Sequence, residues 1–252
     1  MLYRIEHLRG YTLQATDGDI GSVDDLLFDD RTWKVRYVVV DTGGWLSSHR
    51  VLVSSTALGR PDRLALKLPV SITCTKVRDS PQIDADAPVT REQEELLRSH
   101  YGWMAWWSEP ADSDGLLGLD PLVTEGSLSA PPRRARPESG IGFEASLRSA
   151  HEVTGFHIAA TDGDIGHVED LLVDEDGWIV RYLIVDTRNW LPGRKVLIAP
   201  DWVSGVDWLN EKVAMQATRD KIKGGPEYAP DKEIDRRFEH DLYTWYGHAP
   251  YW

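Results

Sequence analysis

The sequence has little cysteine, no long hydrophobic run and few basic residues. Cys74 is the single cysteine among 252 residues, so neither an intramolecular disulfide nor a cluster of cysteine metal ligands can form. A chain without disulfides fits a reducing compartment, and we expect a cytoplasmic protein. The apolar stretches, such as residues 37–40, are as short as a strand, whereas a membrane span needs roughly 18 residues. Residues 1–7 lack the apolar core of a secretory signal, so none is expected there.

Basic charge is also scarce, with 28 Lys and Arg against 41 Asp and Glu and a formal net charge of -13. Binding of nucleic acid relies on Lys and Arg that neutralise phosphates, so this composition argues against a nucleic-acid partner. The sequence contains no phosphate-binding loop, dinucleotide fingerprint or nucleophile elbow. We therefore expect no cofactor and no enzymatic activity.

The sequence does contain an internal repeat with an offset of 145 residues. Residues 10–107 align with residues 155–252 without a gap, and the first 44 aligned positions are identical at 24. An offset this long indicates a duplicated domain rather than a solenoid. We predict one domain over residues 1–107, a flexible linker rich in Pro, Ser and Asp over residues 108–145, and a second domain over residues 146–252. Each domain is long enough for a modest core of its own.

Each half predicts a series of short strands. The segment Thr-Asp-Gly-Asp-Ile-Gly recurs at residues 16–21 and 161–166, and Asp-Gly between two extended runs predicts a hairpin. The strand that begins at Trp33 should place Val35, Tyr37 and Val39 on one face. Short strands joined by tight turns favour an all-β fold of two small antiparallel barrels, because closure removes the open edges of a sheet. In the first half we expect strands over residues 10–15, 20–28, 33–41, 50–53 and 64–68.

A short helix and an aromatic tail are expected at the end of each half. Residues 231–246 have an apolar helical face, and Asp231 is the expected N-cap. In the first half, Thr90 and Gln93 have the spacing of a capping box. The apolar face of the second helix consists of Ile234, Phe238, Leu242 and Trp245.

The order of these segments resembles the PRC-barrel domain family. The resemblance rests on Asp-Gly-Asp-Ile-Gly-x-Val-x-Asp-Leu-Leu-x-Asp at residues 17–29 and Val-Arg-Tyr-x-x-Val-Asp at residues 35–41, both of which have counterparts in the second half. The cytoplasmic domain of the photosynthetic reaction-centre H subunit and the C-terminal domain of the ribosome maturation factor belong to this family. The resemblance implies a bacterial docking module with a barrel of about six strands, and no catalysis. Neither the photosynthetic nor the ribosomal role is carried over.

The acidic loops are one candidate site. Clustered carboxylates could bind a divalent cation or form an acid–base pair, but the spacing is not that of an EF-hand, and the Asp-Gly turn explains these residues without a ligand. The candidate metal ligands are Asp17, Asp19, Asp162 and Asp164.

Tryptophan is abundant, with 11 residues. Trp33 and Trp178 open a strand and are expected to support the core. Trp45 and Trp190 lie in a loop, where a large ring has less core to enter, so they are candidate anchors for a partner. The closing aromatic segments add the candidates Trp103, Trp106, Trp107, Tyr251 and Trp252.

The sequence thus predicts a non-catalytic docking module. We expect two barrels that pack as an intramolecular pseudo-dimer about an approximate two-fold axis and bind a protein partner or another copy of the chain. The alternative is a stress-related protein that binds a small ligand or a divalent metal through the acidic loops.

Overall fold

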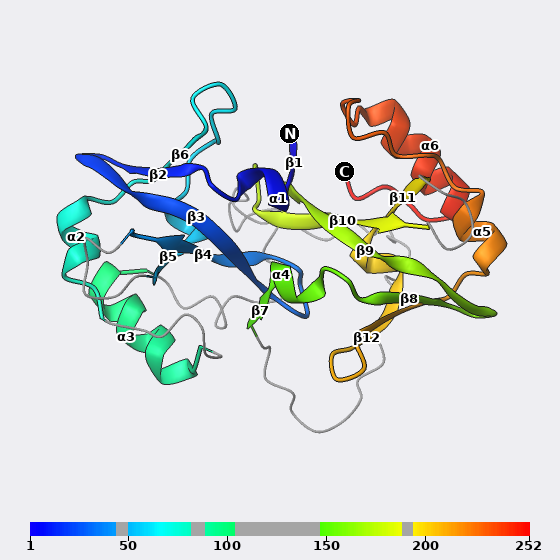
Figure 1. Ribbon diagram of the computed structural model, residues 1–252, viewed down its shortest axis with the longest axis horizontal. Helices are drawn as coiled ribbons and strands as arrows, with labels where there is room; N and C mark the ends of the chain where they lie inside the picture. The colour runs from blue at the N-terminus through cyan, green and yellow to red at the C-terminus, as the bar shows by residue number, and fades with distance from the viewer. Residues whose placement is uncertain (44–49, 82–88, 104–146, 188–193) are drawn as a thin grey trace, which may run out of the picture.

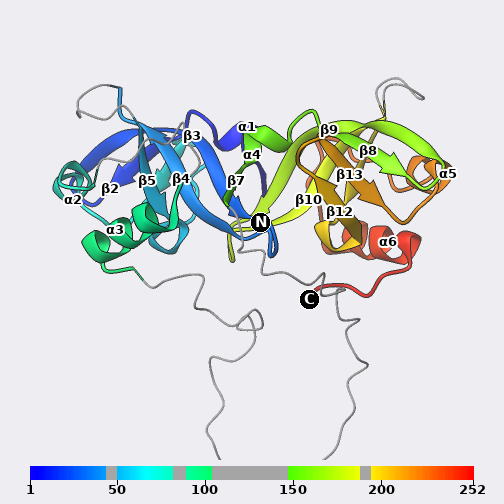
Figure 2. The same ribbon diagram turned by 90° about the horizontal axis from the view of Figure 1, so that it is seen from below.

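The computed structural model describes residues 1–43, 50–81, 89–103, 147–187 and 194–252. These residues form two sheets that lie side by side, with the N-terminus between them (Figure 1). Figure 2 shows the helices near the end of each half on one side of the molecule and two short helices of the junction on the other side. The predicted linker and the loop tryptophans Trp45 and Trp190 lie outside the described residues.

The first sheet has the strand order β5-β4-β3-β2-β6, and β7 pairs with β3 outside this path. Helices α1, α2 and α3 and the short 3-10 helix η1 belong to this half of the chain. The strands are β2 (Thr12–Ala15), β3 (Gly18–Asp29), β4 (Val35–Asp41), β5 (Arg50–Ser54), β6 (Lys67–Pro69) and β7 (Leu147–Ser149). The helices are α1 (Ile5–Leu8), η1 (Ser55–Ala57), α2 (Cys74–Arg78) and α3 (Arg91–Tyr101).

The second sheet has the order β11-β10-β9-β8-β13-β12, and β1 pairs with β9. Its strands are β1 (Leu2–Arg4), β8 (His157–Ala160), β9 (Gly163–Asp174), β10 (Ile179–Asp186), β11 (Lys195–Ile198), β12 (Val203–Asp207) and β13 (Lys212–Met215). The helices of this half are α4 (Ala150–Val153), η4 (Pro200–Trp202), α5 (Arg219–Lys223) and α6 (Arg236–Tyr246).

The sheets differ in two respects from the antiparallel barrels expected. The pairs β2–β6 and β8–β13 are parallel, because a long connection and not a hairpin joins each pair. Neither sheet closes through strand pairing among the described residues. In the first sheet, the segment after β5 approaches β6 through isolated bridges such as that between Leu58 and Val70, and through backbone bonds such as that from Gly59 N–H to the Pro69 carbonyl oxygen.

A bulge changes the face on which Val35 lies. The register between β3 and β4 shifts between Leu27 and Phe28, so the strict alternation expected from Val35 to Val39 is broken. Val35 therefore packs in the main core, whereas Tyr37 and Val39 pack in a smaller cluster beneath α3.

Helix α6 begins five residues after the expected N-cap. Asp235, and not Asp231, accepts the backbone N–H of Phe238 at 2.8 Å and caps the helix. Thr90 and Gln93 form the predicted capping box of α3. Both helices end at a glycine in the left-handed conformation, Gly102 and Gly247, where a side chain would be strained.

The N-terminal strand of each half belongs to the sheet of the other half. Strand β1 pairs with residues 172–174 of β9, and β7 pairs with residues 27–29 of β3. These two pairings are equivalent under the 145-residue offset, residue for residue. The halves thus exchange strands reciprocally.

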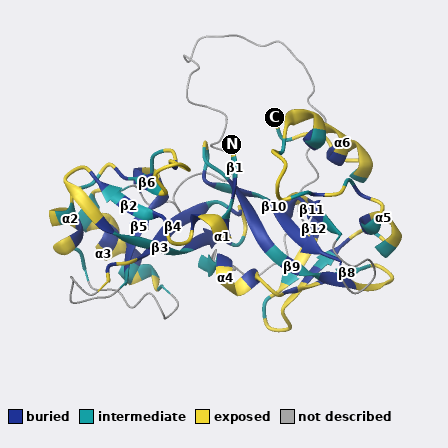
Figure 3. Cartoon of the chain, turned by 45° about the horizontal axis from the view of Figure 1, so that its top comes forward, coloured by how far each residue is buried: buried dark blue, intermediate teal, exposed yellow. Residues whose placement is uncertain are grey.

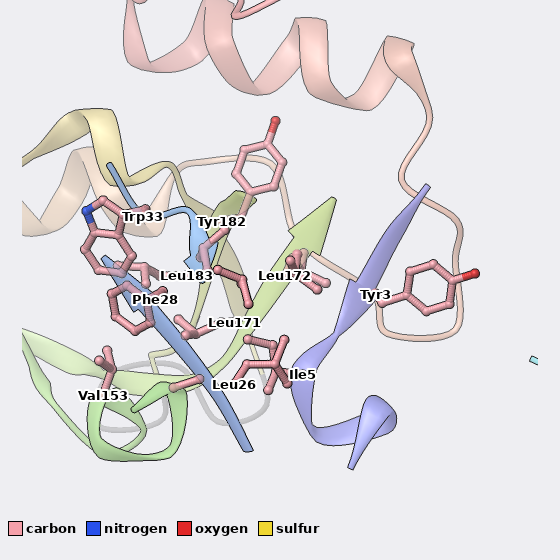
Figure 4. Packing of buried hydrophobic residues seen from close by; sticks show 14 of the residues in the cluster. Tyr3, Ile5, Leu26, Phe28, Trp33, Val153, Leu171, Leu172, Tyr182 and Leu183 are labelled. Atoms are coloured by element: carbon pink, nitrogen blue, oxygen red, sulfur yellow. The ribbon is translucent and has the colours of Figure 1, made fainter. Parts of the chain in front are cut away.

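The exchange joins the two halves into one core. The main hydrophobic cluster contains Leu26 and Phe28 from the first half together with Leu171 and Leu183 from the second. Figure 4 shows these side chains next to one another, and Figure 3 shows the buried strands continuing across the junction. The expectation of a separate core in each domain is therefore wrong, since each sheet is completed by the other half.

Trp33 and Trp178 connect the halves through their backbones. Val35 N–H donates to the Trp178 carbonyl oxygen at 2.7 Å, and Val180 N–H donates to the Trp33 carbonyl oxygen at 2.9 Å. Both tryptophans have left-handed backbones, with φ of 59° and 50°, which costs about 1–2 kcal/mol per residue. The two residues are 4% and 6% exposed, so the predicted core role is confirmed, and the burial offsets the strain.

Gly21 is required by a close approach of β3 to β4. A Cβ at this position would lie 2.1 Å from the Asp41 carbonyl oxygen, and at the equivalent Gly166 it would lie 2.1 Å from that of Asp186. We expect Gly21→Ala to lower the free energy of unfolding by about 2 kcal/mol, because the two strands must separate. In the control Gly205→Ala, the added Cβ has no other atom within 4 Å, so the free energy of unfolding should change little. Urea denaturation of both variants tests this, and equal midpoints would contradict it.

Candidate docking surface

Two reciprocal contacts hold the exchanged strands. Arg4 Nε donates to Asp170 Oδ2 at 2.8 Å, and the Ser149 hydroxyl donates to Asp25 Oδ2. Arg4 and Ser149 occupy equivalent positions of the repeat, as do Asp25 and Asp170. Burial raises the pKa of both carboxyls, and this effect exceeds the opposing effect of the hydrogen bonds. Ionised Asp25 and Asp170 are thus tolerated at the junction because each accepts several hydrogen bonds.

The acidic loops hold the chain's own backbone and lysines. Asp17 Oδ1 accepts the backbone N–H of Cys74 at 2.6 Å, which fixes the start of α2. Asp162 accepts the N–H of Arg219 at 2.8 Å in the same way at α5. In the part of the chain that the structure describes, no three His, Cys, Asp or Glu side chains form a group that could hold a metal ion.

The other two candidate metal ligands face lysines. Asp19 lies 3.3 Å from Lys67 Nζ, and Asp164 lies 4.0 Å from Lys212 Nζ. The pairs are equivalent under the repeat, and all four side chains are at least a third exposed. The acidic loops therefore support the fold through turns, helix starts and surface ion pairs of small energy.

A buried carboxylate attaches α6 to its sheet. Glu239 is 4% exposed, and its oxygens accept from Tyr182 Oη at 2.8 Å, Tyr251 Oη at 2.9 Å and Arg236 Nη1 at 3.0 Å. Tyr182 lies on β10, and Figure 4 shows its hydroxyl pointing toward the helix. Burial is the main cause that raises the pKa of the Tyr182 phenol, so the phenol stays protonated and donates. This network fixes both the helix and the C-terminal segment.

Aromatic rings cover the outer side of this network. Trp252 is 49% exposed and packs edge-on against Tyr243 and Tyr251, with centroid distances of 5.6 and 5.0 Å. The guanidinium carbon of Arg236 lies 4.5 Å from the Trp252 ring. We name the set of Trp252, Tyr243, Tyr251 and Arg236 the α6 aromatic surface.

Trp245 departs from the apolar face predicted for α6. It is 39% exposed, and its indole Nε1 donates to the Lys221 carbonyl oxygen at 2.9 Å. Lys221 Nζ lies 4.6 Å from the ring, so a second exposed indole carries a cation against it. The ring packs over Gly224, whose Cβ would approach it to 2.7 Å.

The corresponding region of the first half is more enclosed. Trp103 is half-buried and stacks on Tyr101 with a centroid distance of 4.0 Å, above the small cluster beneath α3. The candidate anchors Trp106 and Trp107 lie outside the described residues, as do Trp45 and Trp190. The structure therefore brings together Tyr251 and Trp252 and places Trp103 in a different setting.

A family model described as the PRC-barrel domain matches residues 1–63 and 147–220, together more than half of the chain. The chain belongs to the PRC-barrel domain family. Both matches include the exchanged strand of their half. An uncharacterized protein of Deinococcus radiodurans is 35% identical over 96 residues, which are 36% of this chain and 34% of that protein. The chain thus spans about a third of the length of this relative. Among the described residues, no helix has the length and apolarity needed to cross a bilayer.

The Asp-Gly residues of the PRC-barrel motif form the predicted turns, whereas sequence reasoning missed the role of other motif residues at the junction. Asp25 and Asp170 hold the exchanged segments, and the sequence offered no partner for them because Arg4 and Ser149 differ in type. The α6 network carried a usable signal, because Tyr37 and Glu94 are identical to Tyr182 and Glu239 across the repeat. A buried tyrosine and glutamate repeated in both halves indicate a structural pair.

Two aspartates of this PRC-barrel chain should respond to pH with opposite sign. The Cys74 N–H lowers the pKa of Asp17, so Asp17 stabilises the fold above its unfolded-state pKa near 3.8, and this stability is lost as the pH falls. Burial raises the pKa of Asp25, so its contribution is greatest below about 3.8 and declines as the pH rises through the raised value.

The free energy of unfolding of the Asp17→Asn variant should therefore fall furthest below that of the wild type at neutral pH. This difference should become smaller in acid. For Asp25→Asn, the difference in free energy of unfolding from the wild type should be smaller at pH 7 than at pH 4. Urea denaturation of the three proteins from pH 3 to 7 measures these differences. Parallel curves for the two variants would contradict the assignment.

Proposed function

We propose that this protein is a non-catalytic docking module that binds a protein partner through the α6 aromatic surface. The observation that carries the proposal is the exposed indole of Trp252, which packs on Tyr243 and Tyr251 with the Arg236 guanidinium against its face. Tryptophan, tyrosine and arginine dominate the binding energy of protein interfaces. Membership of the PRC-barrel family supports a role in protein interaction.

The hydrogen-bond network of Glu239 beneath the rings favours binding, because side chains that it already orders lose little conformational entropy when a partner binds. Arg236 is ordered by two hydrogen bonds, since its Nη1 donates to Glu239 Oε2 at 3.0 Å and to Tyr251 Oη at 3.1 Å. Side chains that are ordered before binding lose less rotamer freedom on association. The positive charge of Arg236 makes the surface suited to a partner with carboxylates near an apolar segment, in contrast to the acidic chain as a whole.

The duplicated architecture fits the same role. The reciprocal exchange of β1 and β7 supports a pseudo-dimer, in which one chain takes the place of two single-domain copies. One half then is free to diverge, and the aromatic surface differs between the halves. Arg98 and His100 stand in the first half where Tyr243 and Trp245 stand in the second. With a single cysteine in the chain, we place this function in the cytoplasm.

Affinity capture from the native host tests the docking function. We expect Trp252→Ala to lower the recovery of a partner that the wild type retains by at least tenfold, as for a hot-spot ring. The matched control is Leu64→Ala combined with Leu209→Ala, since these side chains are 99% and 92% exposed on loops away from α6. Equal recovery with the tryptophan variant and the wild type would refute the proposed surface.

A further inference from the structure

A cavity of about 400 Å³ lies at the junction, between the N-terminal segment and residues 228–234. Both halves build it. The first half supplies β1, His7, Tyr11 and Arg63, and the second supplies Leu172 of β9 and the segment that precedes α6. This volume is in the range of small-molecule sites. The docking function described above does not involve this cavity.

Two of its cations have no carboxylate partner in the described part of the chain. Arg63 Nη2 donates to the Leu2 carbonyl oxygen at 3.0 Å, and its guanidinium carbon lies 4.4 Å from the centre of the Tyr3 ring. Lys232 also lines the cavity and forms no ion pair among the described residues. Arg63 and Lys232 therefore present positive charge to the cavity, with the carboxylates of Asp231 and Glu233 at its rim.

A third cation that lines the cavity, Arg4, is already paired with carboxylates of the protein and only borders the cavity. It lies 2.8 Å from Asp170, 3.1 Å from Glu169 and 2.9 Å from Glu6. Arg63 and Lys232 are therefore the groups that remain for a ligand. Two carboxylates at the exposed rim, Asp231 and Glu233, oppose a highly charged ligand and favour a monoanion over a phosphate dianion.

The remaining wall is aromatic and apolar. Tyr3, Tyr11 and Tyr228 are each 6% exposed and border the cavity beside Leu172. The backbone N–H of Tyr228 donates to the Lys195 carbonyl oxygen at 2.8 Å, which fixes its position. Burial raises the pKa of the Tyr228 phenol, so the hydroxyl is a donor at neutral pH. A wall of tyrosines and Leu172 beside two cations suits a ligand that combines an aromatic ring with one negative charge.

We propose that this cavity binds a small aromatic carboxylate, with the ring among the tyrosines and Leu172 and the carboxylate at Arg63 and Lys232. Arginine pairs with a carboxylate through two parallel hydrogen bonds, which makes Arg63 the orienting group. The chain's net charge of -13 opposes binding only weakly at physiological salt, because charges more than about 8 Å away are screened.

Calorimetry with the full chain and 1-naphthoate tests the site. We expect saturable binding that Arg63→Gln combined with Lys232→Gln weakens about tenfold or more, which is about 1.4 kcal/mol. Both residues are exposed, so the variant is expected to fold. The control Arg60→Gln removes a positive charge that pairs with Asp176 outside the cavity, and binding should be unchanged.

Three results would overturn the proposal. The first is the absence of saturable binding at millimolar 1-naphthoate. The second is equal weakening by Arg60→Gln, which would show a general charge effect. The third is binding of inorganic phosphate or of neutral 1-naphthalenemethanol as tight as that of 1-naphthoate, which would assign a site for phosphate or for any apolar ring. Retention of most affinity in Arg63→Lys together with Lys232→Arg would support the role of positive charge.

Discussion

Deletion of residues 1–8 is expected to unfold the second half of the chain, although the deleted segment belongs to the first half. The deletion removes β1 from the edge of β9 and takes Tyr3, Ile5 and Leu8 out of the core, where they are 6%, 4% and 0% exposed. Burial of each such side chain is worth about 1.5–3 kcal/mol, so the total loss is about 5 kcal/mol or more. This is comparable with the whole stability of a typical domain.

Hydrogen exchange locates the effect. Amide protection of residues 172–174 in β9 should be lost in the deletion variant, since β1 covers this segment. The matched point variants are Ile5→Ala, expected to cost about 2–5 kcal/mol, and Leu64→Ala, expected to change stability by less than about 0.5 kcal/mol because its side chain is 99% exposed. If the deletion variant unfolded at the same urea concentration as the wild type, the strand exchange would be wrong.

Glu239→Ala is expected to detach α6 from its sheet. The substitution leaves the Tyr182 hydroxyl, which belongs to a residue that is 0% exposed, without its acceptor, and it also releases Tyr251 and Arg236. A buried donor left unsatisfied, together with the lost hydrogen bonds to a charged group, should cost about 3 kcal/mol. Urea denaturation measures the loss of free energy of unfolding. The Trp252 side chain should also become more exposed to solvent in the folded variant.

A double-mutant cycle separates the hydrogen bond from packing. Tyr182→Phe added to Glu239→Ala should recover part of the loss, because no buried phenol then lacks an acceptor. Tyr182→Phe alone leaves Glu239 with Tyr251 and Arg236 as donors and should cost less than Glu239→Ala. Additive effects of the two substitutions would contradict a direct bond between these side chains.

The sequence predicted much of the fold because its signals are local. The Asp-Gly turns at residues 17–18 and 162–163, the capping box of α3 and the strands that follow each depend on a few neighbouring residues. The shifted start of α6, in contrast, does not follow from the local sequence. Asp231 and Asp235 are both acceptable caps by residue type, and only the position of the helix on the sheet selects Asp235.

The candidate site was predicted only in part. Tyr251 and Trp252 meet on the α6 aromatic surface, but Trp245 was assigned to the buried face of the helix. Its ring instead spans Lys221 and Gly224, which come from a different element. Helical periodicity orders side chains around one axis and does not say which face another segment already covers. Glu239 was missed because a glutamate on a helix is usually solvated.

The sequence by itself determined the duplication, the hairpins and their turns, and the absence of disulfides, since these follow from residue identity and short-range geometry. Only the tertiary structure decided that β1 and β7 cross to the opposite sheets. Residues 2–8 and 147–153 share one identical residue, and strands of three residues carry no periodicity. Backbone hydrogen bonds accept a strand of almost any sequence, so the choice of partner depends on which edge and which apolar surface remain open once both halves have folded.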